Sequence, residues 1–231
     1  MSAHTNAGLR EGALVLADGS VFEGELIGAD VGIASGEVVF NTALSGYQEI
    51  LTDPSYAGQM VTFTYPHIGN YGVSSADTES SRAACRGVIV RDLARRHSNH
   101  RAETGLGEHL TALGMPGIAG VDTRRLTRLL RDTGAVPGAF GTASEDELLA
   151  AARAEPGTDG VDLVATVTTP DAYTVESSAP RRIVALDFGV KATILRHLSE
   201  FGAVEVLPAG TPADEILARG ADGIFLSNGP G

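Results

Sequence analysis

The chain has 231 residues, of which 43% are hydrophobic and 20% are charged, values typical of a globular protein with one large domain or two small ones. Its 17 basic and 29 acidic residues give a net charge of −12, which argues against non-specific binding to nucleic acid or to an anionic membrane. A single cysteine excludes an intrachain disulfide framework and a cysteine-based zinc cluster, and we expect no bound metal. Because no apolar run reaches the roughly 18 residues that span a bilayer, and residues 1–12 lack the apolar core of a signal peptide, we expect a cytoplasmic protein.

The first half of the chain is predicted to be rich in β-strands. Apolar or alternating runs indicate strands at residues 13–17, 20–29, 36–44, 59–65 and 87–91. The dipeptide between the first two runs, Asp18-Gly19, is typical of a hairpin turn.

Helices are predicted to follow these strands. The clearest one runs over residues 123–132 with Asp122 as its N-cap, and its period predicts leucines on one face and arginines on the other. The leucines are Leu126, Leu129 and Leu130; the arginines are Arg124, Arg128 and Arg131. A helix at 105–113 ends at Gly114, and Ser144 with Glu147 forms a capping box for another.

The last fifty residues have a different pattern, in which strands and helices alternate. Strands are predicted at residues 182–189, 204–207 and 224–226, and helices at 191–201 and from Thr211-Pro212 to Gly220. This order is that of a parallel, doubly wound sheet, so the predicted fold is α/β. The run 224–226 indicates a buried strand, although the three predicted strands leave an apolar edge without neighbours. The boundaries are residues 1–155 for a first domain, 156–180 for a linker rich in Thr, Ser, Asp and Pro, and 181–231 for an incomplete second domain.

Two polar stretches are candidates for a binding site. The chain ends in Asn228-Gly-Pro-Gly231, a turn after a strand in which glycines let a ligand approach backbone N–H groups. The stretch 36–58 includes Asp53-Pro54-Ser55-Tyr56, which by itself also fits an ordinary type I turn.

These stretches and several others resemble one family, the small, glutamine-hydrolysing subunit of carbamoyl-phosphate synthetase. The resemblance covers residues 13–231 and rests on long motifs in the right order. They are Gly36-Glu-Val-Val-Phe-Asn-Thr, Gly46-Tyr-Gln-Glu-Ile-Leu-Thr-Asp-Pro-Ser-Tyr, Tyr65-Pro-His-Ile-Gly-Asn, Val121-Asp-Thr-Arg-Arg-Leu-Thr-Arg, Asp187-Phe-Gly and Phe225-Leu-Ser-Asn-Gly-Pro-Gly.

The resemblance implies an α+β N-terminal domain followed by the first part of a flavodoxin-like class I glutamine amidotransferase domain. It implies that Ser55, Gly229 and Gly231 contact L-glutamine, and that the Gly229 N–H faces the oxyanion. The ammonia released would pass to the large subunit, which uses ATP, Mg²⁺ and bicarbonate to make carbamoyl phosphate for arginine and pyrimidine synthesis. The small subunit itself is expected to hold no cofactor.

The expected catalytic residues are missing from these 231 residues. In the family a cysteine between glycines, a histidine and a glutamate act on glutamine, and all three should lie beyond Gly231. Cys85 precedes a strand and fits a packing role, so we expect no catalytic residue here and no glutaminase activity from these residues alone. One alternative is a non-catalytic module that docks on the large subunit. Sequencing beyond codon 231 would distinguish this module from a fragment of the enzyme. A phosphate-binding α/β protein is a weaker alternative. The stretch Asp187-Phe-Gly-Val-Lys191 has the glycine spacing of neither the dinucleotide-binding nor the triphosphate-binding motif.

Arginines gather in two places in this acidic chain, one at 91–101 and the other on the 123–132 helix. A solvated face explains such clusters most simply. Subunit docking is the alternative, because arginine is enriched at protein interfaces.

Overall fold

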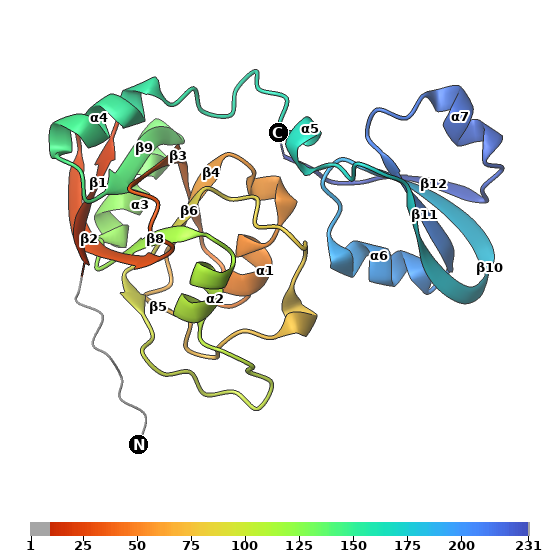
Figure 1. Cartoon of the computed structure of the whole chain (residues 1–231), viewed down its shortest axis with the longest axis horizontal. Helices are drawn as coiled ribbons and strands as arrows, with labels where there is room; N and C mark the ends of the chain where they lie inside the picture. Colours follow the sequence, from red (N-terminus) through yellow and green to blue (C-terminus); the bar gives the residue numbers. More distant parts are fainter. Residues whose placement is uncertain (1–9, 231) are drawn as a thin grey trace. The chain divides into compact units, whose positions relative to one another are not determined.

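The computed structural model describes residues 10–230, and these form two compact units (Figure 1). Neither unit is a single block of sequence. Unit 1 comprises Met1–Tyr47, Gln59–Ser75 and Arg86–Gly157. Unit 2 comprises Gln48–Gly58, Ala76–Cys85 and Thr158–Gly231. The protein is therefore mixed α/β, but its units differ from the sequence blocks predicted above, because two loops of the first half pack with the second half.

Unit 1 is built around a closed barrel of seven strands in the order β1-β2-β8-β6-β4-β3-β9. The barrel strands are β1 (Arg10–Leu16), β2 (Val21–Gly28), β3 (Ile33–Asn41), β4 (Gln59–Phe63), β6 (Gly87–Ile89), β8 (Pro116–Ala119) and β9 (Val136–Gly141). The pairs β3-β4, β4-β6 and β6-β8 are parallel, and the others are antiparallel. The five strands predicted in this half are confirmed. The sequence did not predict β8 and β9, which close the barrel, nor the small pair β5 (His67–Ile68) and β7 (Asp92–Leu93).

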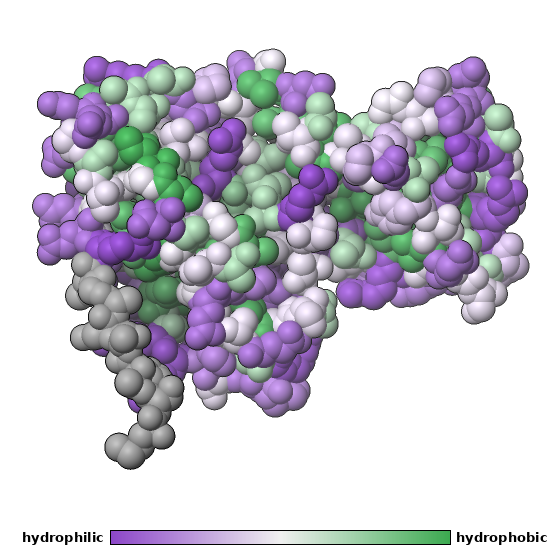
Figure 2. All heavy atoms as spheres, viewed as in Figure 1, coloured by the Kyte–Doolittle hydropathy of each residue, from purple (hydrophilic) through white to green (hydrophobic). Residues whose placement is uncertain are grey.

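The helices of the first half are α1 (Tyr47–Leu51), α2 (Leu106–Ala112), α3 (Thr123–Thr133) and α4 (Glu145–Ala154). All three predicted helices are confirmed. Helix α4 begins with the predicted capping box of Ser144 and Glu147 and packs on β1 and β9 through Leu148 and Ala152. The visible surface near α4 carries hydrophilic residues with more apolar ones between them (Figure 2).

Helix α3 has the two faces predicted for it. Leu126 and Leu130 are buried in the core that they share with the barrel strands, and Leu129 packs against it partly exposed. The Asp122 carboxylate accepts a hydrogen bond from the N–H of Arg125 at 3.0 Å, which caps the first turn.

Unit 2 contains a parallel sheet of three strands in the order β11-β10-β12. Its strands are β10 (Tyr173–Asp187), β11 (Gly202–Pro208) and β12 (Gly223–Leu226), and its helices are α5 (Val164–Val167), α6 (Ala192–Ser199) and α7 (Ala213–Ala218). The predicted alternation of strands and helices is confirmed. Helix α5 and the beginning of β10 fall within the stretch predicted as a linker, since residues 173–175 pair with β11.

Three details of unit 2 differ from the sequence analysis. Strand β12 is not buried, since Ile224 is 48% and Leu226 64% exposed, while the expected uncovered apolar edge is confirmed. Phe201 is 60% exposed because α6 ends at Ser199, before Phe201 can join its apolar face. Helix α7 begins at Ala213 with Pro212 as its N-cap, so it starts after the Thr211-Pro212 pair at which the sequence predicted its beginning. No helix within residues 10–230 is long and apolar enough to cross a membrane.

Truncation of Leu126 tests the packing of α3. We expect Leu126→Ala to lower the free energy of unfolding by about 2–5 kcal/mol, because it leaves a cavity in the core. Arg128→Ala, on the exposed face of the same helix, should change it by less than about 0.5 kcal/mol. Urea unfolding followed by circular dichroism measures both values, and equal losses would contradict the predicted orientation of the helix.

Stability should also depend on His109 of α2. Its Nε2 is buried without a hydrogen-bond partner in residues 10–230, and burial lowers the pKa of His109 below its ordinary value of 6.5. As the pH falls below 6.5, the unfolded chain binds a proton at this site before the folded chain does, so the free energy of unfolding decreases. Between pH 7 and pH 5, we expect the free energy of unfolding of His109→Gln to decrease by less than that of the unmodified protein. Urea titrations at each pH measure both values. Identical pH dependence of both proteins would refute this role.

Candidate functional site

The candidate site lies in unit 2, at the carboxyl ends of β10 and β12. The central strand β10 pairs with β11 on one side and with β12 on the other, so the order of strands reverses at β10. Ligands of open α/β sheets bind outside the carboxyl ends of the strands at such a reversal. The loops that follow β10 and β12 are therefore placed where a ligand is expected.

The loop after β10 is held by a buried carboxylate. Asp187 is 6% exposed, and its Oδ1 accepts hydrogen bonds from the N–H groups of Gly189 at 2.9 Å and Val190 at 2.8 Å. Its Oδ2 accepts a third from Thr169 at 2.8 Å. Gly189 has a φ of +116°, which other residues rarely adopt. Three backbone donors satisfy the charge of Asp187, so its role is to fix this loop.

Asp187 also acts on a neighbouring phenol. Burial, and then the charge of Asp187, raise the pKa of Tyr173 above its ordinary value of 10.0. Tyr173 is therefore a neutral group at physiological pH.

Ser55 reaches this edge of the sheet from a distant part of the sequence. It lies in a short turn of residues 54–56, where Asp53 Oδ1 accepts a hydrogen bond from the Ser55 N–H at 2.9 Å. The Ser55 hydroxyl accepts a hydrogen bond of 3.0 Å from Nδ2 of Asn228, which follows β12. The structure thus brings together two of the sequence motifs that suggested a site. Both motifs lie inside one compact unit, although 48–58 and 158–231 are far apart in the sequence.

Gly229 is next to this contact and needs to be glycine. A Cβ atom at this position would lie 2.0 Å from the carbonyl oxygen of Phe188. Within residues 10–230 the N–H of Gly229 has no hydrogen-bond partner, and Asn228 Oδ1 is buried without one. The loop therefore offers a donor and an acceptor that the described protein does not use. Gly231, the third predicted contact, lies outside the described residues.

Sequence reasoning missed one charged residue of the site, Lys191. Its Nζ lies 3.5 Å from Asp53 Oδ2, with the Lys191 side chain 34% and the Asp53 side chain 14% exposed. The lysine follows the Asp187 loop and contacts the carboxylate that fixes the Ser55 turn. A signal was present in the sequence, because Lys191 is the only lysine among 17 basic residues.

Cys85 fits the packing role that the sequence predicted. It is 7% exposed, and its Sγ contacts the backbone oxygen of Leu51 at 3.5 Å. The constellation of Asp53, Ser55, Lys191 and Asn228 can hold a small polar ligand by hydrogen bonds and charge, while the described residues place no exposed thiol beside it.

Comparison with known proteins identifies the family of the chain. The family model described as "Carbamoyl-phosphate synthase small chain, CPSase domain" matches residues 14–140, more than half of the chain. The chain belongs to the carbamoyl-phosphate synthase small-chain family. The resemblance stated from the sequence motifs is thus confirmed.

Curated relatives with the name carbamoyl phosphate synthase small chain extend the match. Those from Polynucleobacter asymbioticus, Pseudomonas syringae pv. tomato and a Synechococcus species are 50%, 52% and 50% identical, each over 94% of this chain. The chain covers 62%, 63% and 60% of their lengths, so it spans less than two thirds of these small chains. Among solved structures, a peptidase M28 precursor from Shewanella amazonensis aligns at 9% identity over 78% of this chain and 42% of that one, and its TM-score of 0.31 is too low to support a common fold.

The burial of Cys85 predicts a slow thiol. We expect its reaction with Ellman's reagent to be at least roughly tenfold slower in the native protein than in urea, because only an accessible thiolate reacts. Spectrophotometric thiol titration of this small chain measures both rates. Rapid labelling without denaturant would show that Cys85 is a reactive group after all.

Proposed function

We propose that this chain is the glutamine-binding part of the small subunit of a glutamine-hydrolysing carbamoyl-phosphate synthetase. Ammonia from glutamine would pass to the large subunit, which binds ATP and Mg²⁺ and makes carbamoyl phosphate from bicarbonate in the cytoplasm. The product serves arginine and pyrimidine biosynthesis. Family membership supports this proposal, and the local geometry of unit 2 supports the assignment of its residues.

The observation that carries the assignment is the contact between Ser55 and Asn228 beside Gly229. The resemblance in the sequence implied that Ser55 and Gly229 contact the same glutamine molecule. A hydrogen bond of 3.0 Å joins the Ser55 turn to the residue before Gly229, although 173 positions separate the two bonded residues. Such a contact supports one shared ligand.

The strand order supports the finer fold assignment. Numbered along the chain, the three parallel strands have the order 2-1-3. This is how the flavodoxin-like order 2-1-3-4-5 begins, and the ligand of that fold lies at the reversal between strands 1 and 3. We therefore assign residues 181–231 to the first part of a class I glutamine amidotransferase domain.

The chain's own residues would bind and orient the substrate. The unused N–H of Gly229 is suited to stabilise the oxyanion that forms when the amide carbon of glutamine becomes tetrahedral. Lys191 holds Asp53, and Asp53 fixes the turn that presents the Ser55 hydroxyl. Nucleophilic attack would fall to groups outside residues 1–231, because Cys85 is buried with its Sγ against the backbone oxygen of Leu51.

Substitution of Ser55 tests the proposal in the complete heterodimer. Ser55→Ala should raise the KM for glutamine roughly several-fold to tenfold, the effect of losing one hydrogen bond of about 1 kcal/mol. Carbamoyl-phosphate synthesis from added ammonia should stay intact, because that reaction bypasses glutamine. Steady-state assays with each nitrogen donor measure both values.

The variant keeps the backbone N–H of Ser55, so the hydrogen bond to Asp53 that fixes the turn remains. A matched control is Ser75→Ala, which removes a hydroxyl bonded to Glu103 in unit 1 and should alter neither reaction. Equal loss of glutamine-dependent and ammonia-dependent synthesis in Ser55→Ala would show that the hydroxyl is structural, and would remove it from the glutamine site.

A further inference from the structure

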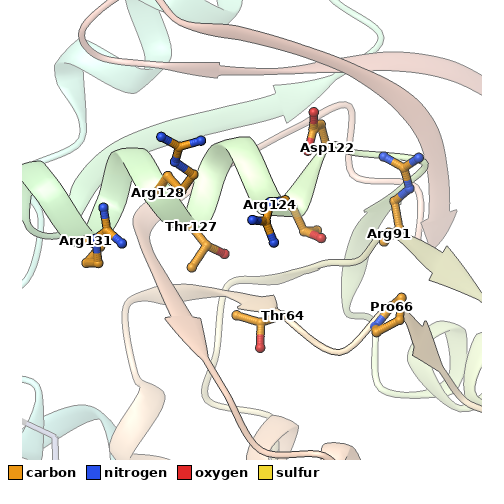
Figure 3. A pocket seen from close by; sticks show the side chains of 9 residues that line it. Thr64, Pro66, Arg91, Asp122, Arg124, Thr127, Arg128 and Arg131 are labelled. Atoms are coloured by element: carbon orange, nitrogen blue, oxygen red, sulfur yellow. The ribbon is translucent and has the colours of Figure 1, made fainter.

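Unit 1 has a groove lined by arginines that the glutamine site does not use. The groove has a volume of about 950 Å³ and lies between α3, residues 64–66 and the end of β6. Its charged residues are Arg91, Arg124, Arg128, Arg131 and Asp122, with threonines and Pro66 between them. Figure 3 shows the three helical arginines along α3 and Arg91 across from its first turn.

Most of these arginines are not neutralised by the protein's own acids. Within residues 10–230, the guanidinium groups of Arg91, Arg124 and Arg128 have no carboxylate or other hydrogen-bond partner. Arg131 pairs with Asp132 at 2.8 Å. Some arginines elsewhere in this acidic chain do pair with acids, as Arg10 does with Asp30 at 2.9 Å and Arg219 does with Glu215 at 2.7 Å. The groove therefore brings three guanidinium groups without an acidic partner together on one face.

Two arginines of the row, Arg124 and Arg128, do not serve the stability of α3. Arg124 lies in the first turn, where the helix dipole disfavours a positive charge, and Arg128 repels it from four residues away. The neighbouring Arg125 shows the alternative, because its guanidinium lies 4.1 Å from the centre of the Phe22 ring and donates to the Val21 oxygen at 2.9 Å. One arginine of the helix is thus used by the fold, whereas Arg124 and Arg128 in the groove are not.

The groove also contains a polar atom without a partner. The hydroxyl oxygen of Thr127, between Arg124 and Arg128, is buried and makes no hydrogen bond in the part of the chain that the structure describes. A buried hydroxyl normally has a partner, so this site has room for an incoming hydrogen-bonding group.

The length of the row indicates the kind of occupant. Arg124 and Arg131 are seven residues apart, which is about 10 Å along a helix. Arginine binds carboxylates in bidentate geometry, and a row of this length matches several carboxylates on one segment better than one small anion. Nucleic acid is disfavoured by the net charge of −12.

We infer that this groove is a docking surface for a carboxylate-rich segment of the large synthetase subunit. The choice of that partner rests on the proposed function, whereas the chemistry of the surface does not. Charge complementarity at such a docking surface accelerates association and fixes the register of the two partners. The groove belongs to unit 1 and the glutamine residues to unit 2, so binding of the large subunit and binding of glutamine can be altered separately.

The experiment measures binding of the complete small subunit to its purified large subunit by surface plasmon resonance. The test variant is Arg124→Glu with Arg128→Glu, and Arg124→Ala with Arg128→Ala is the milder pair. The control, Arg95→Glu with Arg96→Glu, makes the same change of net charge at exposed arginines outside the groove. Thermal melting and the KM for glutamine, measured on each variant, show whether the fold and the other site are intact.

We expect the groove reversal to weaken binding at least tenfold at 50 mM salt, the alanine pair to weaken it less, and the control to change it less than twofold. The effect should shrink at 500 mM salt, because salt screens exposed charges. Unchanged binding by a folded groove variant, or equal weakening by the control, would overturn the inference while leaving the proposed function in place. Absence of binding by the unmodified small subunit would instead overturn the proposed function.

Two further measurements exclude other occupants. Sedimentation velocity of the same variants tests a second copy of the chain, and loss of self-association without loss of large-subunit binding would contradict the inference. Inorganic phosphate at constant ionic strength tests a small anion. Competition by millimolar phosphate that is as strong as the arginine reversal would assign the groove to a phosphate-bearing ligand instead.

Discussion

Unit 2 depends on a carboxylate buried at the start of α6. Glu79 is 8% exposed, and its Oε2 and backbone oxygen accept hydrogen bonds from Thr193 and Ala192 in the first turn of that helix. Its N–H donates to the hydroxyl of Thr52, which donates to the backbone oxygen of Gln48. A buried charge is tolerated because helix N–H groups satisfy it. These bonds attach two loops of the first half of the chain to the parallel sheet, and one of those loops carries Ser55.

The attachment explains both what the sequence could predict and what it could not. Strands and helices with a clear period, such as α3 with Leu126 and Leu130 on one side, are local patterns and were predicted with nearly correct limits. The assignment of residues 48–58 and 76–85 to the second unit depends on hydrogen bonds between residues more than a hundred positions apart, such as that from Thr193 to Glu79. No local pattern contains that information.

The two barrel strands that the sequence did not reveal show a different limit. Strands β8 and β9 contain proline and glycine, which are depleted in strands, so their composition indicates turns. The barrel requires those glycines, because a Cβ at Gly117 would lie 2.6 Å from Val88 and one at Gly138 would lie 2.7 Å from Val38. The candidate glutamine site shows the same difference between residues that local motifs reveal and contacts that only the folded chain makes. Ser55 and Gly229 were identified through motifs, whereas the contact of Lys191 with Asp53 appeared only in three dimensions.

The isolation of that lysine has a practical consequence. The chain has sixteen arginines and one lysine, and the side chain of that lysine is 34% exposed next to Asp53. Amine chemistry that spares guanidinium groups therefore addresses one side chain, besides the amino terminus. Reductive methylation with ¹³C-formaldehyde would place one NMR-visible dimethylamine among the residues that surround the Ser55 turn. Because the chain has a single lysine, NMR spectroscopy can observe the surroundings of the Ser55 turn without any substitution.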